Sequence, residues 1–335
     1  MEKSLVVAVV GATGAVGREM LNTLAGRNFP ASRVVALASA RSAGRKVPFG
    51  EDGEELTVQE LSSDSFKGVD LALFSAGGST SQTFAPHAVA SGCVVVDNSS
   101  AWRMDERCPL VVPEVNPHAL EEHNGIIANP NCSTIISMVA VNALKELSPI
   151  EAITASTYQA VSGAGAGGLA ELEAQVRAYA EGKPLAAETF PYQIAFNLIP
   201  QIGSPCENGY TTEEMKMQNE GRKILHLPEM KVTCTCVRVP VLRSHSISLS
   251  VRTKEKISVA AAREAIAKAK GCKLVDDLAN KQYPMPLDTS DQDLVYVGRI
   301  RDDLVDDRAL ALWCAGDQIR KGAATNAVQI AELLV

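Results

Sequence analysis

Residues 5–17 read LVVAVVGATGAVG, and this stretch decides the fold. The continuous apolar run Leu5–Val10 predicts a strand that is covered on both faces. The run leads into a turn with three glycines, and helical spacing follows over Arg18–Ala25. A buried strand, a glycine-rich turn and a helix in this order are typical of the first unit of a Rossmann-type dinucleotide-binding domain.

The three glycines of this turn have separate expected roles. Gly11 permits the tight turn, Gly14 lets a pyrophosphate approach the backbone, and Gly17 lets helix and strand pack closely. The helix N-terminus then presents N–H groups and a positive dipole end to phosphates. The spacing is GxxGxxG rather than GxGxxG, so the prediction rests on the strand–turn–helix context; the alternative is a turn that binds no nucleotide. The predicted cofactor contacts are Gly11, Thr13, Gly14, Ala15 and Val16.

The end of the next strand indicates which dinucleotide binds. Arg33–Ala38 is strand-like, and the following residues, 39–45, read SARSAGR. NAD-binding domains place a carboxylate there for the ribose 2′-hydroxyl, but this segment has arginines and hydroxyls instead. We therefore predict NADP, with its 2′-phosphate held by Ser39, Arg41 and Ser42. The alternative is a solvated basic loop.

The remaining patterns predict two domains of different texture. Leu71–Phe74 and Cys93–Asp97 are further short apolar strands, so the first part of the chain predicts a parallel α/β sheet. From about Ile150 the strands are longer and half polar, which indicates a mixed α+β domain. We place an NADP-binding domain at 1–128, completed by a C-terminal helix within 316–335, and a catalytic and dimerisation domain at 129–315. The second domain's predicted elements are strands at Ile153–Ala160, Lys231–Pro240, Ser246–Thr253 and Asp293–Ile300, with helices at Leu169–Ala180 and Val259–Lys270; the tail helix covers Ala323–Leu334.

Composition excludes several classes of protein. The chain has 335 residues, 46% of them hydrophobic and 21% charged, as in ordinary globular proteins. A net charge of −7 and 4% aromatic residues argue against nucleic acid as a partner. No apolar run of 18 residues predicts a membrane span. Eight cysteines without a CxxC pair predict neither a metal site nor a disulfide scaffold, and favour a reducing, cytoplasmic compartment.

One cysteine has the setting of a nucleophile. Residues 129–134 read NPNCST and precede an apolar helical stretch, Ile135–Leu147. Pro130 cannot lie inside that helix, and its neighbours are capping residues, so Cys132 is expected at a helix N-terminus. This position favours the reactive thiolate. The alternative is a buried, inert cysteine.

Two further features belong with this thiol. His245 lies between two predicted strands and is a candidate base, since base and nucleophile are close in space and not in sequence. Residues 163–168 read GAGAGG and match GxGxxG, yet no selector residue follows at the right distance. We interpret this segment as a flexible glycine loop near the reacting centre, not as the main dinucleotide site.

Seven motifs lie in order along the whole chain. They are GATGAVG (11–17), SARSAG (39–44), NPNCST (129–134), TYQAVSGAG (157–165), EEMKM (213–217), RVPVLRSHS (238–246) and GDQIRKGAA (316–324). Together they resemble aspartate-semialdehyde dehydrogenases, from end to end. The resemblance implies NADP-dependent reductive dephosphorylation of aspartyl 4-phosphate to aspartate 4-semialdehyde through a cysteine thioester. That reaction would serve lysine, diaminopimelate, methionine, threonine and isoleucine biosynthesis, in a homodimer or homotetramer.

The resemblance also implies residue roles. The nucleophile would be Cys132, Gln159 would orient the substrate, and His245 would be the general acid/base. Substrate would be bound at its carboxylate by Arg238 and at its amine by Glu213. The remaining implied contacts are Arg103 and Lys216 with phosphate, and Ser162, Gly163 and Gln318 with the cofactor.

Two positions differ from the sequence that is usual in this family. Gln318 stands where asparagine is common, and Ser244 precedes the histidine where glycine is common, so we expect a modest loop adjustment. Two other functions stay open. N-acetyl-glutamyl-phosphate reductase uses the same chemistry, but its substrate has no ammonium group for Glu213. A catalytically inactive nucleotide-binding sensor is the other alternative.

Overall fold

The computed structural model describes residues 5–50 and 53–335, and the chain divides into two compact units. Unit 1 comprises Met1–Asn131 and Ala323–Val335, and unit 2 comprises Cys132–Gly322. The domain boundaries expected from the sequence, after residue 128 and before residue 316, stay predictions.

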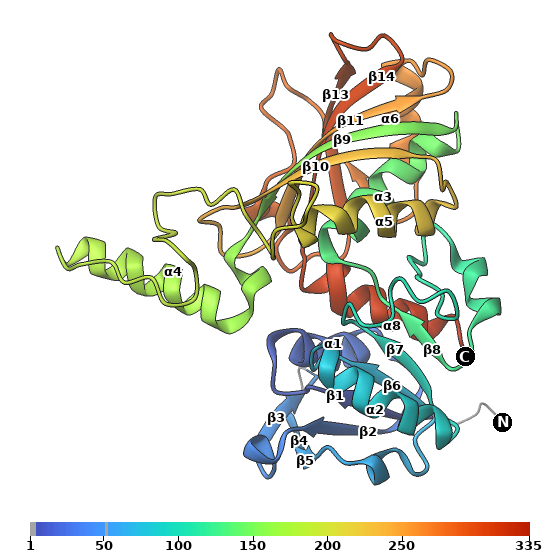
Figure 1. Cartoon of the computed structure of the whole chain (residues 1–335), viewed down its shortest axis with the longest axis vertical. Coiled ribbons are helices and arrows are strands. Elements are labelled where there is room, and N and C mark those ends of the chain that lie inside the picture. The colour runs from blue at the N-terminus through green and yellow to red at the C-terminus, as the bar shows by residue number, and fades with distance from the viewer. Residues whose placement is uncertain (1–4, 51–52) are drawn as a thin grey trace. The chain divides into compact units, whose positions relative to one another are not determined.

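Unit 1 is built on a parallel sheet of six strands in the order β5-β2-β1-β6-β7-β8. From β1 the chain passes outward to β2 and then returns to place β6 on the other side of β1 (Figure 1). Such a reversal of strand order creates the crevice at which α/β sheets bind ligands. The strands are β1 (Leu5–Val10), β2 (Ala31–Ala38), β5 (Gln59–Glu60), β6 (Leu71–Phe74), β7 (Val94–Asp97) and β8 (Ile126–Ala128); β3 (Lys46–Phe49) and β4 (Glu54–Thr57) form a separate hairpin.

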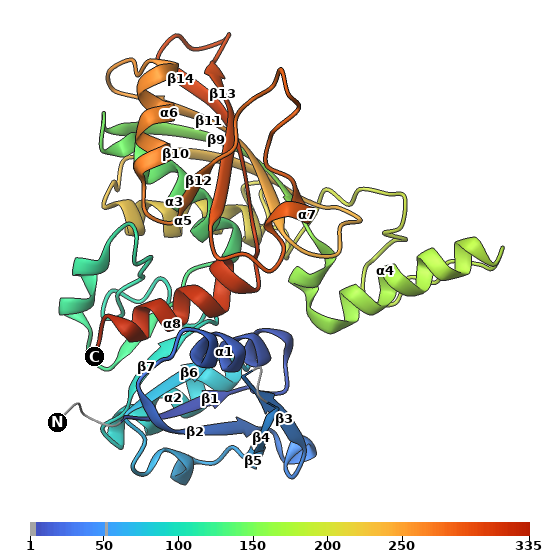
Figure 2. The ribbon, with the colours of Figure 1, turned by 180° about the vertical axis from the view of Figure 1, so that it is seen from behind.

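Helices cover both faces of this sheet. On one face, α1 (Ala15–Gly26) packs with α8 (Thr325–Glu332) in a hydrophobic cluster that includes Leu21 and Val328 (Figure 2). On the other face, α2 (Gly78–Ala90) packs against a second cluster. The apolar strands are therefore covered on both faces, as their sequences predict. The tail helix belongs to unit 1.

Two glycines in the β1–α1 turn are fixed by sterics. Gly11 has φ +87°, and a Cβ there would lie 2.4 Å from the backbone oxygen of Ser75. A Cβ on Gly17 would lie 2.1 Å from the backbone oxygen of Gly11. Only glycine allows the turn and helix to approach the strands this closely.

Unit 2 is built on a mixed sheet of six strands in the order β10-β9-β11-β14-β13-β12. Its outer pairs β10/β9 and β12/β13 are parallel, and the inner pairs are antiparallel. This confirms the predicted mixed α+β texture. The strands are β9 (Ile150–Gln159), β10 (Lys231–Arg238), β11 (His245–Thr253), β12 (Cys272–Leu274), β13 (Val295–Asp302) and β14 (Ala309–Gly316).

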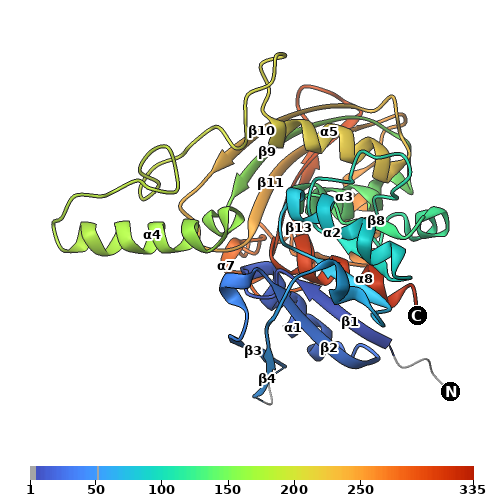
Figure 3. The same cartoon turned by 60° about the horizontal axis from the view of Figure 1, so that its bottom comes forward.

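Three helices pack on one side of this sheet. They are α3 (Cys132–Lys145), α5 (Thr212–Leu225) and α6 (Val259–Lys268), with α3 in the middle. A fourth helix, α4 (Gly165–Ala180), projects away from the sheet, and the chain that follows it returns alongside (Figure 3). The short helix α7 (Pro286–Thr289) completes the unit.

Most predicted elements are confirmed with small shifts of their ends. Two differ in kind. The 163–168 stretch is not a flexible loop, because Val161–Ala164 forms a 3-10 turn and Gly165 then begins α4. The tail helix begins as a π-helical turn, Arg320–Ala324, before α8. No helix among the described residues combines the length and the apolarity that a membrane span requires.

Candidate active site

Cys132 is the first residue of α3, as the capping pattern predicts. It is half-buried and forms no disulfide. A Cβ on Gly322, in the predicted 316–324 motif, would lie 2.9 Å from the Cβ of Cys132. That glycine therefore leaves the space beside the thiol-bearing residue that any larger side chain would fill.

Gln159 ends β9 and joins α3 to α5 through hydrogen bonds. Its amide Nε2 donates to the Ser133 hydroxyl at 2.8 Å and to Glu213 Oε1 at 3.3 Å. Lys216 Nζ pairs with Glu213 Oε2 at 2.7 Å, because residues three apart share a helix face. A connected row of polar side chains thus joins Gln159, Glu213 and Lys216. It brings two sequence motifs together, since Gln159 and Glu213 are 54 positions apart in the chain.

Arg238 ends β10, the strand beside β9, and is 7% exposed. Its guanidinium donates to the backbone oxygen of Ala160 at 2.7 Å and lies 5.8 Å from the centre of the Phe190 ring. Burial lowers the pKa of Arg238 below its ordinary range, and negative charge at Cys132 and Glu213 opposes this. The guanidinium stays cationic, so the site offers a fixed positive charge near the thiol.

His245 begins β11 and is fully buried. Its Nδ1 accepts the backbone N–H of Ala160 at 3.1 Å, so in the neutral ring the proton is on Nε2. Nε2 itself has no hydrogen-bond partner among the described residues. Burial, and then the charge of Arg238, lower the pKa of His245 from 6.5 to about 3, while Glu213 opposes them. The ring is therefore a neutral donor in a buried site.

Gly163 lies against both of these side chains. A Cβ on Gly163 would lie 2.7 Å from a guanidinium nitrogen of Arg238 and 3.4 Å from Nε2 of His245. A larger residue at this position would therefore collide with the guanidinium and crowd the imidazole ring. The structure thus brings Gly163 beside two of the predicted site residues, Arg238 and His245.

Ser244, which stands where the resembled family commonly has glycine, has a backbone conformation typical of glycine. It has φ +73°, a conformation that favours glycine and costs another residue roughly 1–2 kcal/mol. Its N–H donates to Gln318 Oε1 at 2.7 Å, and its hydroxyl lies 3.2 Å from that of Ser290. Gln318 Nε2 in turn donates to the Ser162 hydroxyl. The two unusual residues therefore contact each other, and the backbone before His245 keeps a glycine-like conformation.

In unit 1, the predicted dinucleotide-binding residues follow the carboxyl ends of β1 and β2 in the parallel sheet. The ends of β1 and β2 are adjacent, and Gly11 N–H donates to the backbone oxygen of Leu37 at 2.8 Å. Gly14 is exposed, has no side-chain cap, and starts a helix without an acidic residue in its first turn. This arrangement of amides and dipole suits an anion.

The loop after β2 supplies the expected cations at the same edge. Ser39 and Arg41 are exposed, whereas Ser42 is 8% exposed. No carboxylate among the described residues pairs with Arg41 or Arg45. Of the predicted phosphate ligands, Arg103 also lies in unit 1, where backbone oxygens of Asn129 and Asn98 accept from its guanidinium at 3.0 and 2.9 Å.

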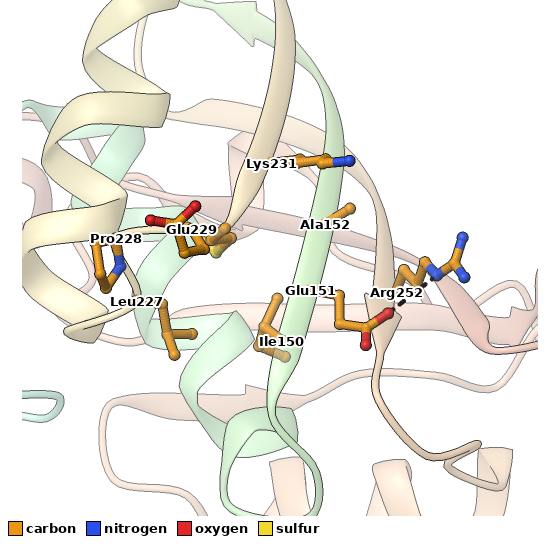
Figure 4. A pocket seen from close by; sticks show the side chains of 9 residues that line it. Ile150, Glu151, Ala152, Leu227, Pro228, Glu229, Lys231 and Arg252 are labelled. Atoms are coloured by element: carbon orange, nitrogen blue, oxygen red, sulfur yellow. Dashed lines mark ion pairs between the residues drawn. The ribbon is translucent and has the colours of Figure 1, made fainter.

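A separate hollow of about 550 Å³ lies at the other end of unit 2's sheet. Its residues come from the starts of β9 and β10, from the loop before β10, and from β11 (Figure 4). Gln159 and Arg238 lie at the opposite ends of β9 and β10, so the hollow is remote from both. Glu151 and Arg252, 3.3 Å apart, form an ion pair there. No predicted site residue lines it. In the described part of the chain, no group of three or more His, Cys, Asp or Glu has a metal-binding arrangement.

Sequence reasoning missed several groups that shape this site. The Ser133 hydroxyl accepts a hydrogen bond from the Gln159 amide. The backbone of Ala160 forms hydrogen bonds with both Arg238 and His245. Phe190 underlies the guanidinium. Ser133 could have been inferred, because it lies inside the NPNCST motif. The contacts of Ala160 and Phe190 could not, because they join segments that are distant in the sequence and no local pattern marks them.

Comparison with known proteins agrees with this geometry. Two family models match: the semialdehyde dehydrogenase NAD binding domain over residues 6–123, and the semialdehyde dehydrogenase dimerisation domain over residues 141–321. The chain is 52% identical to aspartate-semialdehyde dehydrogenase of Synechocystis sp., with 100% of this chain and 98% of the relative covered. It is 53% identical to that of Aquifex aeolicus, with 98% and 97% covered.

Solved structures agree as well. A crystal structure of aspartate semialdehyde dehydrogenase II complexed with ASA, from Vibrio cholerae, superposes with a TM-score of 0.96 at 44% identity. The match covers 99% of this chain and 98% of that one. The fold, the full-length identity and the cysteine-centred cluster lead to one conclusion: this chain belongs to the aspartate-semialdehyde dehydrogenase family.

Proposed function

We propose that the protein is an NADP-dependent aspartate-semialdehyde dehydrogenase of amino-acid biosynthesis. In the biosynthetic direction it converts aspartyl 4-phosphate and NADPH to aspartate 4-semialdehyde, phosphate and NADP. The observation that carries the proposal is the cluster around Cys132, in which a helix-start thiol shares a site with a buried arginine and a buried, unpartnered imidazole N–H. Relatives with this name at about half identity support the choice of substrate.

The first step is covalent. The Cys132 thiolate attacks the acyl carbon, the carbon–oxygen bond to phosphate breaks, and phosphate leaves with the bonding electrons. The product is a thioester on Sγ, so one difficult transfer is divided into two easier ones. The position of Cys132 at the start of α3 favours the thiolate that this attack requires.

His245 serves the oxygen of the same carbon. The Nε2–H donates to that oxygen as negative charge develops on it, which stabilises charge most effectively in a water-excluded site. A full proton shuttle would place a second proton on Nδ1, opposite the Ala160 N–H. We therefore assign His245 as a neutral hydrogen-bond donor, and proton shuttling requires that the Ala160 contact first opens.

Five other side chains hold the substrate. Arg238 binds the substrate carboxylate bidentately, as a guanidinium does best, and Glu213 binds the ammonium. In the structure Glu213 pairs with Lys216, so the substrate amine would replace or share that partner. Lys216 and Arg103 are assigned to phosphate, and Gln159 orients the reacting group.

The residues of unit 1 fit NADP. The start of α1 has no side-chain cap, and with the close-packed glycine turn it offers a site for the pyrophosphate. Arg41, which pairs with no carboxylate of the described residues, offers a site for the 2′-phosphate. The contacts are assigned to Gly11, Thr13, Gly14, Ala15, Val16, Ser39, Arg41 and Ser42, and in unit 2 to Ser162, Gly163 and Gln318. When bound, NADPH supplies the hydride for reduction of the thioester.

The alternatives fare less well. N-acetyl-glutamyl-phosphate reductase acts on a substrate without an ammonium group, so Glu213 would have no substrate group to bind. An inactive sensor would not need the Cys132 cluster. We also propose a homodimer or homotetramer in the cytoplasm. Support for self-association comes from the family model, which describes residues 141–321 as a dimerisation domain.

Phosphate-dependent reduction of NADP with aspartate semialdehyde tests the function. We expect turnover with aspartate semialdehyde and phosphate, and none with N-acetyl-glutamate semialdehyde. Turnover of the acetylated substrate alone would support the rival reductase. NADP binding without turnover of either aldehyde would support the sensor.

A further inference from the structure

The chain that follows α4 contacts the substrate-binding arginine. We call residues 186–203 the return segment. Phe190 in this segment lies under the Arg238 guanidinium at 5.8 Å. Further on, Ile199 and Arg238 exchange backbone hydrogen bonds of 2.9 and 3.0 Å. A hollow of about 760 Å³ is lined by the return segment, Ala164 and Arg238. The orientation of Arg238 therefore depends on where this segment lies.

Two side chains of α4 hold the return segment in place. The first is Glu171, which is only 7% exposed. Its Oε2 accepts backbone N–H groups from Glu188 at 2.9 Å, from Thr189, and from Phe190 at 3.4 Å. No basic side chain of the described residues pairs with Glu171. A buried carboxylate without a counter-cation is costly unless hydrogen bonds compensate, and here backbone dipoles do so.

The second is Gln175, one turn further along α4. Its Oε1 accepts the N–H groups of Ile194 and Ala195 at 3.0 and 2.8 Å. Its Nε2 donates to the backbone oxygen of Ala186 at 2.7 Å and to Glu171 Oε1 at 3.2 Å. The return segment lacks regular secondary structure over most of its length, so these side chains replace the hydrogen bonds that a strand or helix would supply.

We propose that Glu171 is a positioning residue for substrate binding. By fixing residues 188–190 it holds Phe190 beneath Arg238 and keeps the guanidinium in the orientation that binds the substrate carboxylate. This inference rests on the proposed role of Arg238. It predicts that loss of the Glu171 carboxylate weakens aldehyde binding selectively, although Glu171 touches no reacting atom.

The substitution Glu171→Gln isolates the charge. An amide has the same shape, but it carries two N–H donors and one oxygen, so it cannot accept from all four N–H groups that now face the carboxylate. If the ordered segment is then populated about one-tenth of the time, the apparent affinity falls about tenfold. Glu173→Gln is the matched control, because Glu173 is on the same helix but exposed and only loosely paired with Arg177 at 3.8 Å.

The experiment measures KM for aspartate semialdehyde, phosphate and NADP in the parent, Glu171→Gln, Glu173→Gln and Arg238→Lys. We expect Glu171→Gln to raise the aldehyde KM about tenfold and to leave the other two KM values within about twofold. Hydrogen exchange of residues 186–195 should become faster in Glu171→Gln alone. Gln175→Met, which loosens the same segment from the next turn, should shift the aldehyde KM in the same direction and serves if Glu171→Gln fails to fold.

The outcomes are distinct. An unchanged aldehyde KM in Glu171→Gln, with Arg238→Lys impaired, overturns the inference and leaves the proposed function intact. An equal rise of all three KM values indicates general destabilisation and also overturns it. An unimpaired Arg238→Lys refutes the proposed role of Arg238 itself, and the inference with it.

Discussion

Cys132 differs from the other seven cysteines in its backbone setting. It is the first residue of α3, whereas two other half-buried cysteines, Cys206 and Cys272, are not at a helix start. We expect Cys132→Ser to lower turnover by about 1,000-fold or more, because a hydroxyl is a much weaker nucleophile at neutral pH. NADP binding, measured by titration calorimetry, should survive. Cys206→Ser is the control and should keep full activity; a rate within tenfold of the parent in Cys132→Ser would remove the thiol from the mechanism.

His245 makes stability depend on pH. Its pKa is lowered from 6.5 in the unfolded chain to about 3 in the folded one, chiefly by burial. Between these values the unfolded state binds more protons, so stability is complete above pH 6.5 and falls as the pH drops toward 3. The slope is at most about 1.4 kcal/mol per pH unit for one group.

His245→Gln tests this dependence. Glutamine keeps a donor near the position of Nε2 but does not titrate. Urea unfolding of parent and variant at pH 7, 6, 5 and 4 should show that the parent loses more stability than the variant with each step. Parallel curves for the two proteins would mean that His245 is not the group that titrates. Because the pKa of His245 is lowered to about 3, we also expect that its titration does not affect the reaction rate between pH 5 and 8.

The loop between β2 and β3 is the element that we propose selects the cofactor. Arg41 is exposed and has no carboxylate partner among the described residues, so it is available to a 2′-phosphate. Arg41→Ala should lower the ratio of kcat/KM for NADP to that for NAD about 10- to 150-fold, the value of a charge-assisted contact. Arg33→Ala, which removes another exposed arginine at the far end of β2, should leave the ratio unchanged. An unchanged ratio in Arg41→Ala would place the phosphate site elsewhere.

Elements with strong periodicity or special residues could be predicted, and others could not. β1 and β6 are buried on both faces, so their apolar runs predict them to the residue. By contrast, α2 carries small and polar residues with Pro86 inside it, and no apolar stripe marks it as a helix. The tail helix could be assigned from its spacing, but its π-helical start could not, since short local patterns do not distinguish helix types.

The same division holds within the candidate site. Cys132 and His245 belong to motifs whose chemistry the residue types reveal. Glu171 resembles any surface glutamate of a helix, and its neighbour Glu173 is one. Only the return of the chain along α4 distinguishes the two, because the partners of Glu171 are backbone N–H groups, which every residue but proline carries.

At the scale of the whole chain, the last helix completes the first unit. α8 contributes Ala327, Val328 and Ile330 to the cluster formed with α1 and the sheet. We expect Ile330→Ala to lower the unfolding free energy by about 2–5 kcal/mol, since Ile330 is fully buried. Leu333→Ala, at an exposed position three residues on, should change it by less than about 0.5 kcal/mol. Urea unfolding followed by near-ultraviolet circular dichroism measures both, and equal effects would contradict the packing of α8 in unit 1.

The place of α8 has a consequence for biogenesis. A nascent chain emerges from the ribosome with its N-terminus first, yet unit 1 lacks part of its hydrophobic cluster until residues 323–335 have emerged. Throughout translation of unit 2, the nascent unit 1 therefore exposes the apolar side chains that α8 will cover. A stop codon at position 323 should consequently destabilise the part of the protein that was synthesised first, and the truncated chain should depend more on chaperones than the chain that includes α8.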